Sequence, residues 1–187
     1  MSNICTKPAI VFDIDNTLVY VTPIAPNNLE NTEFFTIKIK RRKFYVQTRP
    51  YLNYFLEKIS KLYNVYFFTA SSQEYASQII NKIYPQVKQF HSFFRDSCTE
   101  MYGYLVKDLN KIKTPLQKTL LIDDSTGSAL KSPKNLVKIF PWSGEKDDEV
   151  LKNLVVILEN IAFDEDLRAS FIEIAKTGNF KGIEAFN

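Results

Sequence analysis

Two pairs of aspartates follow two short apolar runs in this sequence. Asp13 and Asp15 come directly after the run AIVF, and Asp123 and Asp124 directly after TLLI. Each aspartate taken singly is well explained as a helix N-cap or a turn residue. Together, four carboxylates at one sheet edge would repel each other, and a buried carboxylate cluster without a counter-ion is costly. The joint pattern therefore indicates a site for a hard cation such as Mg²⁺, which prefers oxygen ligands.

The spacing of Asp13 and Asp15 indicates phosphoryl chemistry. On an extended strand, residues two apart point the same way, so the two carboxylates could face one substrate atom, one as nucleophile and one as acid/base. The hydroxyls of Thr17, Thr69 and Ser71 could donate hydrogen bonds to phosphate oxygens. Because phosphoryl transfer relies on neutralising those oxygens, a lysine or arginine should complete the site.

The composition excludes several other kinds of site. The chain has 187 residues, which favours one domain with a substantial core. Its single histidine excludes a His-rich metal site, and its two cysteines exclude a zinc knuckle or a disulfide scaffold. Its five glycines never fall in a nucleotide-binding pattern. An enzyme of this composition must work with carboxylates, hydroxyls and lysine or arginine.

The charge balance does not call for a nucleic-acid partner. Lysine and arginine number 24 against 21 aspartate and glutamate, for a net charge of +3. The one dense run, KRRK at 40–43, is explained either as a solvated turn, which we favour, or as an anion patch or localisation signal. The start lacks the apolar run of a signal peptide and no stretch reaches membrane-spanning length, so we expect a nuclear or cytoplasmic, non-secreted protein without a membrane partner.

Apolar runs alternate with helical patterns along most of the chain. This alternation predicts an α/β fold with a Rossmann-like open parallel sheet and helices on both faces. In such sheets, ligands bind at the carboxyl ends of the strands. Residues 34–48 differ, because alternating apolar residues flank KRRK in the pattern of a β-hairpin. The predicted strands are 9–12, 64–69, 90–94, 119–122 and 136–139. One predicted helix starts at Pro50, a second covers 73–83, and two more lie within 147–178.

Six segments in order give the chain a specific resemblance. It resembles a haloacid dehalogenase superfamily phosphatase, within the family of small phosphatases for the RNA polymerase II C-terminal domain, the NLI-interacting factor-like family. A lone DxDxT motif is a weak signal, whereas the ordered set is a strong one. The matching segments are VFDIDNTLV, TRPYLNYFL, VYFFTAS, FRDSC, VKDL and LLIDDS.

The resemblance implies a role for each catalytic residue. Asp13 would be the nucleophile that forms an aspartyl-phosphate, which splits one hard hydrolysis into two easier steps. Asp15 would protonate the leaving hydroxyl and then activate water. Thr69 would hydrogen-bond the phosphoryl group, and Lys107 would offset the charge of Asp13 and the phosphate. Replacement of Asp13 by Asn should therefore abolish Mg²⁺-dependent hydrolysis.

The resemblance also implies the metal ligands. Asp123 and Asp124 would hold Mg²⁺, with Asp13 and the backbone carbonyl of Asp15 as further ligands. Many relatives have Asn where this chain has Asp124. Asp124 can bind Mg²⁺ as well as an asparagine can, but its extra negative charge faces an anionic substrate. This charge could change both the set of metal ligands and the rate of hydrolysis.

The chain length bears on the substrate. The gaps between the motifs hold no separate cap domain, so we expect one phosphatase domain over 1–187, with a hairpin insertion at about 30–48 and C-terminal helices at about 147–178. An open site suits a phosphorylated protein segment. The resemblance implies a phosphoserine or phosphothreonine beside proline. The predicted substrate-binding residues are Arg95 at the mouth and Ile37, Ile39 and Phe44 in the hairpin, which could alternatively pack inward.

Three functions therefore compete. The leading prediction is a Mg²⁺-dependent phosphoserine/phosphothreonine protein phosphatase, acting as a monomer on segments such as the RNA polymerase II C-terminal repeats, with no direct nucleic-acid contact. The alternatives are a catalytically weak scaffold on the same fold and a small-molecule phosphatase. The retention of both Asp13 and Asp15 favours the active enzyme, because scaffold relatives can lack the acid/base carboxylate.

Overall fold

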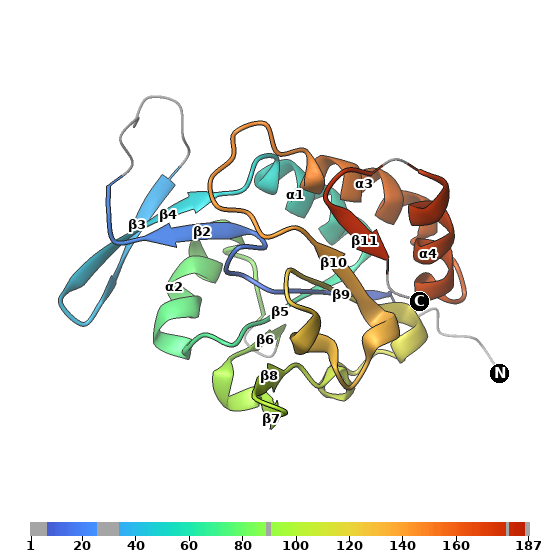
Figure 1. Ribbon diagram of the computed structural model, residues 1–187, viewed down its shortest axis with the longest axis horizontal. Coiled ribbons are helices and arrows are strands. Elements are labelled where there is room, and N and C mark those ends of the chain that lie inside the picture. The colour runs from blue at the N-terminus through green and yellow to red at the C-terminus, as the bar shows by residue number, and fades with distance from the viewer. Residues whose placement is uncertain (1–6, 26–33, 89–90, 179, 186–187) are drawn as a thin grey trace.

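A six-stranded sheet forms the centre of the computed structural model, which describes residues 7–25, 34–88, 91–178 and 180–185 (Figure 1). The strand order is β11-β10-β9-β1-β5-β6, and every pairing is parallel except that of β11 with β10. This confirms the predicted mostly parallel α/β sheet. The strands are β1 (Ala9–Phe12), β5 (Asn64–Phe68), β6 (Ser92–Phe93), β9 (Thr119–Asp123), β10 (Leu136–Ile139) and β11 (Ile183–Ala185). The predicted strand at 90–94 is shorter than expected, and Phe90 lies outside the described residues.

Four α-helices follow the predicted apolar stripes; α2 starts and ends at the predicted residues, whereas the others start later than predicted. They are α1 (Leu52–Leu62), α2 (Gln73–Ile83), α3 (Val150–Ile161) and α4 (Leu167–Thr177). Helix α1 begins after Pro50 because Tyr51, at its N-cap, has a left-handed backbone with φ of 67°. Helix α3 begins at Val150, whose amide donates a hydrogen bond to Oδ1 of Asp148 at 3.1 Å.

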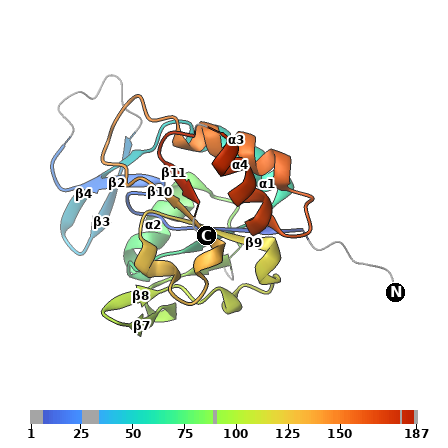
Figure 2. The same cartoon turned by 45° about the vertical axis from the view of Figure 1, so that its right-hand side comes forward.

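The two faces of the sheet are covered differently. Ile10 and Phe12 of β1 point to a face whose core includes buried residues from all four α-helices. Helices α1, α3 and α4 lie together on this side in both views (Figures 1 and 2). On the opposite face, Val11 packs in a smaller core with Leu109 and Ala129, which lie in short 3-10 helices. Helices therefore lie on both faces, as predicted, but those of the second face are single 3-10 turns.

A second, three-stranded sheet stands beside the central one, with the order β2-β4-β3 (Figure 1). Strands β3 (Phe34–Ile39) and β4 (Arg42–Thr48) form the predicted hairpin. Strand β2 (Val19–Thr22) pairs with β4 and was not predicted. Residues 30–33 of the predicted insertion lie outside the described residues.

A short hairpin of β7 (Thr99–Met101) and β8 (Tyr104–Val106) was also not predicted. Within the described ranges, no large cap domain is inserted between the strands. The helices described here are all too short or too polar to cross a membrane.

Candidate active site

The three strands that end in candidate residues are neighbours in the sheet. Strand β1 lies between β5 and β9, and Phe12 is in register with Phe67 and Ile122. Asp13 therefore leaves the sheet between Thr69, which follows β5, and Asp123, which ends β9. The parallel topology brings the polar strand ends to one edge, as the sequence predicted.

Lys107 bridges two of the aspartates. Its Nζ donates hydrogen bonds to the Asp13 carboxylate and to Oδ2 of Asp123, the latter at 2.6 Å. The Lys107 side chain is only 2% exposed. Its backbone is held as well, because the Lys107 amide donates to the carbonyl of Ser128 at 2.8 Å. The lysine required by phosphoryl chemistry thus lies inside the carboxylate cluster.

The cluster holds more negative charge than Lys107 alone balances. Burial raises the pKa of Asp13 to about 8, and the Asp123 charge adds to this rise while Lys107 opposes it. Burial lowers the pKa of Lys107, but the charges of Asp123 and Asp13 outweigh burial and raise it above its ordinary value, so Lys107 stays a cation. Burial and the Asp123 charge also raise the pKa of Asp124. A further cation would stabilise all three carboxylates.

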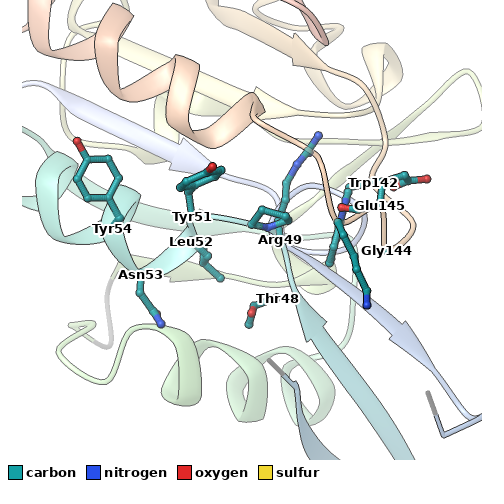
Figure 3. Close-up of a pocket in the computed structure, with 11 residues that line it drawn as sticks. Thr48, Arg49, Tyr51, Leu52, Asn53, Tyr54, Trp142, Gly144 and Glu145 are labelled. Carbon is teal, nitrogen blue, oxygen red and sulfur yellow. The ribbon is translucent and has the colours of Figure 1, made fainter. Parts of the chain in front are cut away.

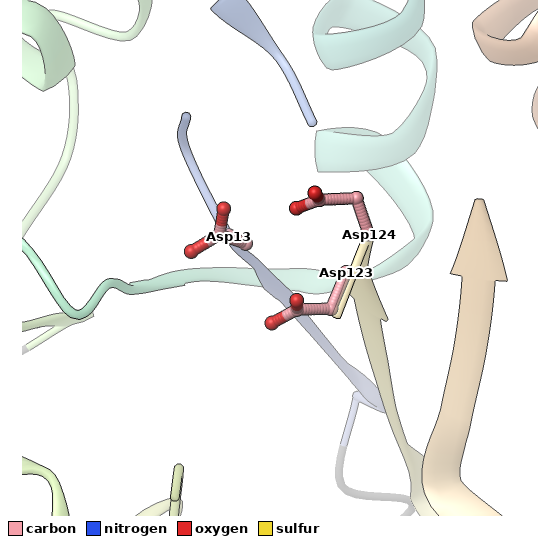
Figure 4. A group of neighbouring side chains, drawn as sticks. All are labelled: Asp13, Asp123 and Asp124. Carbon is pink, nitrogen blue, oxygen red and sulfur yellow. The ribbon is translucent and has the colours of Figure 1, made fainter. Parts of the chain in front are cut away.

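Asp13, Asp123 and Asp124 converge in the geometry of a possible metal centre (Figure 4). Each offers one carboxylate oxygen, and these oxygens lie within 4.8 Å of one another. The Ser125 amide donates to Oδ1 of Asp123 at 2.8 Å, and Thr17 Oγ1 donates to Asp124 at 3.3 Å. An all-oxygen donor set of this kind fits a hard divalent cation.

The Asp15 carboxylate faces another direction. It accepts hydrogen bonds from Ser71 Oγ, at 2.8 Å, and from the Tyr75 hydroxyl. The predicted strand alternation does not apply, because β1 ends at Phe12 and both aspartates lie in the following loop. Asp13 and Asp15 nevertheless line the same cleft, with separate sets of partners.

The cleft has a volume of about 450 Å³. Thr69 is buried on its wall, where its Oγ1 accepts a hydrogen bond from the Ser71 amide at 3.0 Å. Arg95 lies at the wall too, and its Nε donates to the Ala70 carbonyl at 2.7 Å. The lining residues include Asp13, Asp15, Thr69, Ser71, Arg95, Tyr104, Lys107, Asp123, Asp124 and Ser128.

A smaller apolar pocket adjoins this cleft. Ile39 and Phe44 of the hairpin line it together with Tyr75, and Ser71 and Arg95 belong to both hollows. The volume of the apolar pocket is about 260 Å³. It could therefore hold a side chain of a segment whose neighbouring residue occupies the cleft.

Ile37 differs from its predicted place. It is 3% exposed and belongs to the main core rather than to the pocket wall. The reason is that strand β3 packs against α2, so an inward position in the middle of this strand is covered.

Tyr75 and Arg49 are two residues of the site region that were missed from the sequence. Tyr75 lies next to the buried stripe of α2 and gave no chemical signal. Arg49 lies between Thr48 and Pro50, and its place in the TRPYLNYFL segment was its one signal. It lines a separate pocket with Tyr51 and Trp142 (Figure 3) and donates to the carbonyl of Thr17 at 3.1 Å. Arg49 therefore supports the loop that holds Asp13 and Asp15.

Comparisons with known proteins identify a matching family model and several similar proteins. The family model described as "NLI interacting factor-like phosphatase" matches residues 8–168. A human protein, "Carboxy-terminal domain RNA polymerase II polypeptide A small phosphatase 2", is 33% identical over 162 residues, which cover 86% of this chain and 59% of that protein. "CTD nuclear envelope phosphatase 1 homolog" of Drosophila melanogaster is 29% identical over 174 residues, covering 87% of this chain and 71% of the relative.

A solved structure supports the fold. The structure of "Fcp1, an essential RNA polymerase II CTD phosphatase" matches with a TM-score of 0.60 and 22% identity, covering 94% of this chain and 55% of that one. The chain spans 29%, 59% and 52% of the length of three curated relatives that it matches. These matches confirm the resemblance stated from the sequence segments.

Proposed function

The chain belongs to the family of NLI interacting factor-like phosphatases, and on that premise we propose that it hydrolyses phosphoserine or phosphothreonine in protein segments. One observation above all supports this function. Asp13 and Asp123 share a buried lysine at the carboxyl edge of the sheet, with Asp124 beside them and Asp15 lining the same cleft. A nucleophile, an acid/base, a buried cation and a metal donor set are then within one hollow.

The proposed reaction has two steps. In the first, a carboxylate oxygen of Asp13 bonds to phosphorus as the bond to the serine or threonine oxygen breaks, and Asp15 gives a proton to that oxygen. In the second, Asp15 takes a proton from water, whose oxygen attacks phosphorus and frees Asp13 and phosphate. Lys107 and the Thr69 hydroxyl would stabilise the charge on the phosphoryl oxygens. The hydrogen bonds from Ser71 and Tyr75 would orient Asp15.

Asp13, Asp123 and Asp124 would hold the divalent cation, with the Asp15 carbonyl as a further ligand, and we propose Mg²⁺. When bound, such an ion supplies positive charge that offsets the phosphate and the carboxylates. Asp124 adds one negative charge compared with an asparagine at this position. This charge should strengthen metal binding and weaken the attraction of the phosphate.

The proposed substrate is an extended phosphorylated segment with an apolar residue, such as proline, beside the phosphorylated one. The absence of a cap over the described cleft and the adjoining pocket of Ile39 and Phe44 support this choice over a small metabolite. Arg95, between the two hollows, would contact the phosphate or the segment's backbone. The C-terminal repeats of RNA polymerase II are the first substrate to test, since the human relative is named for that domain.

We further propose that the chain acts as a monomer, as one phosphatase domain, and in the nucleus. The names of the polymerase and nuclear-envelope relatives support the compartment. A hairpin insertion and the two C-terminal helices then belong to the same domain. A scaffold function and a small-molecule phosphatase are the alternatives that an activity test must separate from it.

Phosphate release from a phosphoserine-proline peptide, measured with Mg²⁺ and with EDTA, tests the proposal. We expect release with Mg²⁺, little with EDTA, and none from the Asp13→Asn variant. Release from small phosphate metabolites but not from the peptide would contradict the protein substrate. No release from any ester, by protein shown to be folded by circular dichroism, would favour the scaffold.

A further inference from the structure

The tip of the β3–β4 hairpin carries four consecutive cations. Lys40 and Arg41 form the turn, and Arg42 and Lys43 begin β4. All four are exposed, and in the part of the chain that the structure describes no carboxylate forms an ion pair with any of them. The hairpin projects from the central sheet (Figure 1). Such a concentration of positive charge attracts anions.

The register of the hairpin separates Arg42 from Lys43. Ile39 lies directly opposite Arg42 across the two strands. Because opposite residues and residues two apart share a face, Arg42 shares the face of Ile39 and Phe44. Lys43 alternates to the other face, where its Nζ lies 4.9 Å from the ring centre of Tyr45. One cation of the tip therefore faces the site, while its neighbour faces away.

Three hollows follow one another toward Arg42. The catalytic cleft and the apolar pocket share Ser71 and Arg95. The apolar pocket in turn shares Ile39 and Phe44 with a hollow that Arg42 lines together with the turn. A segment that leaves the cleft across the apolar pocket therefore arrives at a basic surface. A segment that spans two adjoining hollows needs several residues of extended chain, since each residue advances about 3.3 Å.

We propose that Arg42, with Lys40 and Arg41, binds an acidic or phosphorylated side chain of the substrate segment itself, beyond the apolar pocket. This inference rests on the proposed phosphatase function and adds a charge requirement to it. Arginine suits the role because its guanidinium donates two parallel hydrogen bonds to a carboxylate or phosphate. A polybasic tip that binds a membrane surface acts through its total charge, so Arg42 and Lys43 would contribute alike, whereas the proposed role needs Arg42 more than Lys43.

Two matched variants and three peptides test the proposal. One phosphoserine-proline peptide has a glutamate pair about four or five residues before the phosphoserine, another has the pair about as far after it, and the third has glutamines at both places. The readout is the ratio of kcat/KM for each glutamate peptide to that for the glutamine peptide, so a general loss of activity in a variant cancels. We expect one glutamate peptide to be preferred by about five- to tenfold, through KM, and added salt to reduce this preference. Arg42→Gln should remove most of the preference, and Lys43→Gln should retain it.

Equal losses in both variants, or no preference in the wild type, would overturn the proposal. A membrane role would also overturn it. In that case the protein would bind phosphatidylserine vesicles, both variants would weaken this binding equally, and the kcat/KM ratios of the glutamate peptides to the glutamine peptide would stay at one. If the wild type hydrolyses none of the peptides, the proposed function fails, but fluorescence anisotropy with labelled peptides still tests the tip. In that case, tighter binding of a glutamate peptide that depends on Arg42 and not on Lys43 supports the inference, and equal binding of all peptides contradicts it.

Discussion

Arg49 and Asp148 form a two-pronged ion pair that joins distant parts of the chain. Arg49 Nε donates to Oδ1 of Asp148 at 2.8 Å, and Nη2 donates to Oδ2 at 2.7 Å. The same guanidinium donates to the carbonyls of Thr17, at 3.1 Å, and Phe140, at 3.2 Å. Arg49 is 1% exposed, so it has exchanged its water for these four bonds. The loop after β1, the entry to α1 and the segments beside β10 and α3 are thereby held together.

Arg49→Lys should destabilise the fold by about 2–4 kcal/mol, because a lysine ammonium cannot make the parallel pair with Asp148 and reach both buried carbonyls at once. Urea unfolding measures this loss. Lys152→Ala is the control, since Lys152 pairs with Glu149 on the surface, where the loss of an ion pair should change stability little. Equal stabilities of the two variants would show that the buried pair has no structural importance.

Asp13→Asn should reduce phosphate release by at least about a thousandfold, because an amide is a far poorer nucleophile toward phosphorus. The fold should persist, since Lys107 still has Asp123 as its partner. Hydrolysis of p-nitrophenyl phosphate and the urea midpoint are measured side by side. Glu57→Gln, on exposed α1 surface, is the control and should behave as wild type. Wild-type turnover in the Asp13 variant would refute the nucleophile assignment.

Asp15→Asn should distinguish substrates by their leaving groups. Nitrophenolate leaves without a proton, whereas the serine oxygen needs one. The rate of the first step should therefore fall more with a phosphoserine peptide than with p-nitrophenyl phosphate. Single-turnover kinetics with both substrates measures that step. Tyr75→Phe removes one hydrogen bond to Asp15 and should produce a smaller loss with the same substrate bias. Equal losses on both substrates would argue against Asp15 as the acid.

Mg²⁺ should raise the thermal midpoint of the protein by about 5 °C, because it relieves the repulsion of three carboxylates that lie within 4.8 Å. EDTA should reverse the rise. Asp124→Asn should roughly halve the rise of the midpoint in Mg²⁺, since one negative charge is removed while an oxygen ligand remains. The same loss of charge should lower KM for phosphate esters. Asp147→Asn, at an exposed position, is the matched control and should show the full rise. An unchanged midpoint in Mg²⁺ would contradict the metal site.

His91 should make stability fall in mild acid. Burial lowers its pKa below the ordinary value, and the ring stacks on Tyr66 with centres 4.1 Å apart. Because His91 binds a proton more tightly in the unfolded chain than in the folded one, acid favours unfolding. The stability contributed by the neutral His91 ring is fully present above about pH 6.5 and is lost as pH falls through the pKa of His91 in the folded protein. Wild type should lose more stability than His91→Phe between about pH 7.5 and about pH 5 in urea unfolding. Equal losses of stability in the wild type and in His91→Phe would show that His91 does not cause the acid destabilisation.

Local pattern predicted the elements that are buried on all sides. The residues of β1 are all apolar, those of β9 are apolar in the centre, and every residue of both strands is buried. Helix α2 was predicted to the residue because its stripe has a clear helical period. Strand β2 escaped prediction, since only the first residue of VYVT is buried and the strand pairs with β4, which lies far along the chain. The three-residue strands β7 and β8 are too short for any periodicity to be visible.

The residue types alone already narrowed the chemistry that we propose for this protein. Carboxylates after apolar strands, hydroxyls and a lysine, with one histidine and few cysteines, favour phosphoryl transfer over chemistry that relies on histidines or thiols. The tertiary structure decided which of these groups meet. Lys107 reaches Asp13 across 94 residues, and Tyr75 reaches Asp15 across 60, because β1 lies between β5 and β9. That strand order comes from the packing of the whole core, so no local pattern contains it. Likewise, the alternation of residues in β4 was visible in the sequence, but only the pairing with β3 put Arg42 on the side of the pocket.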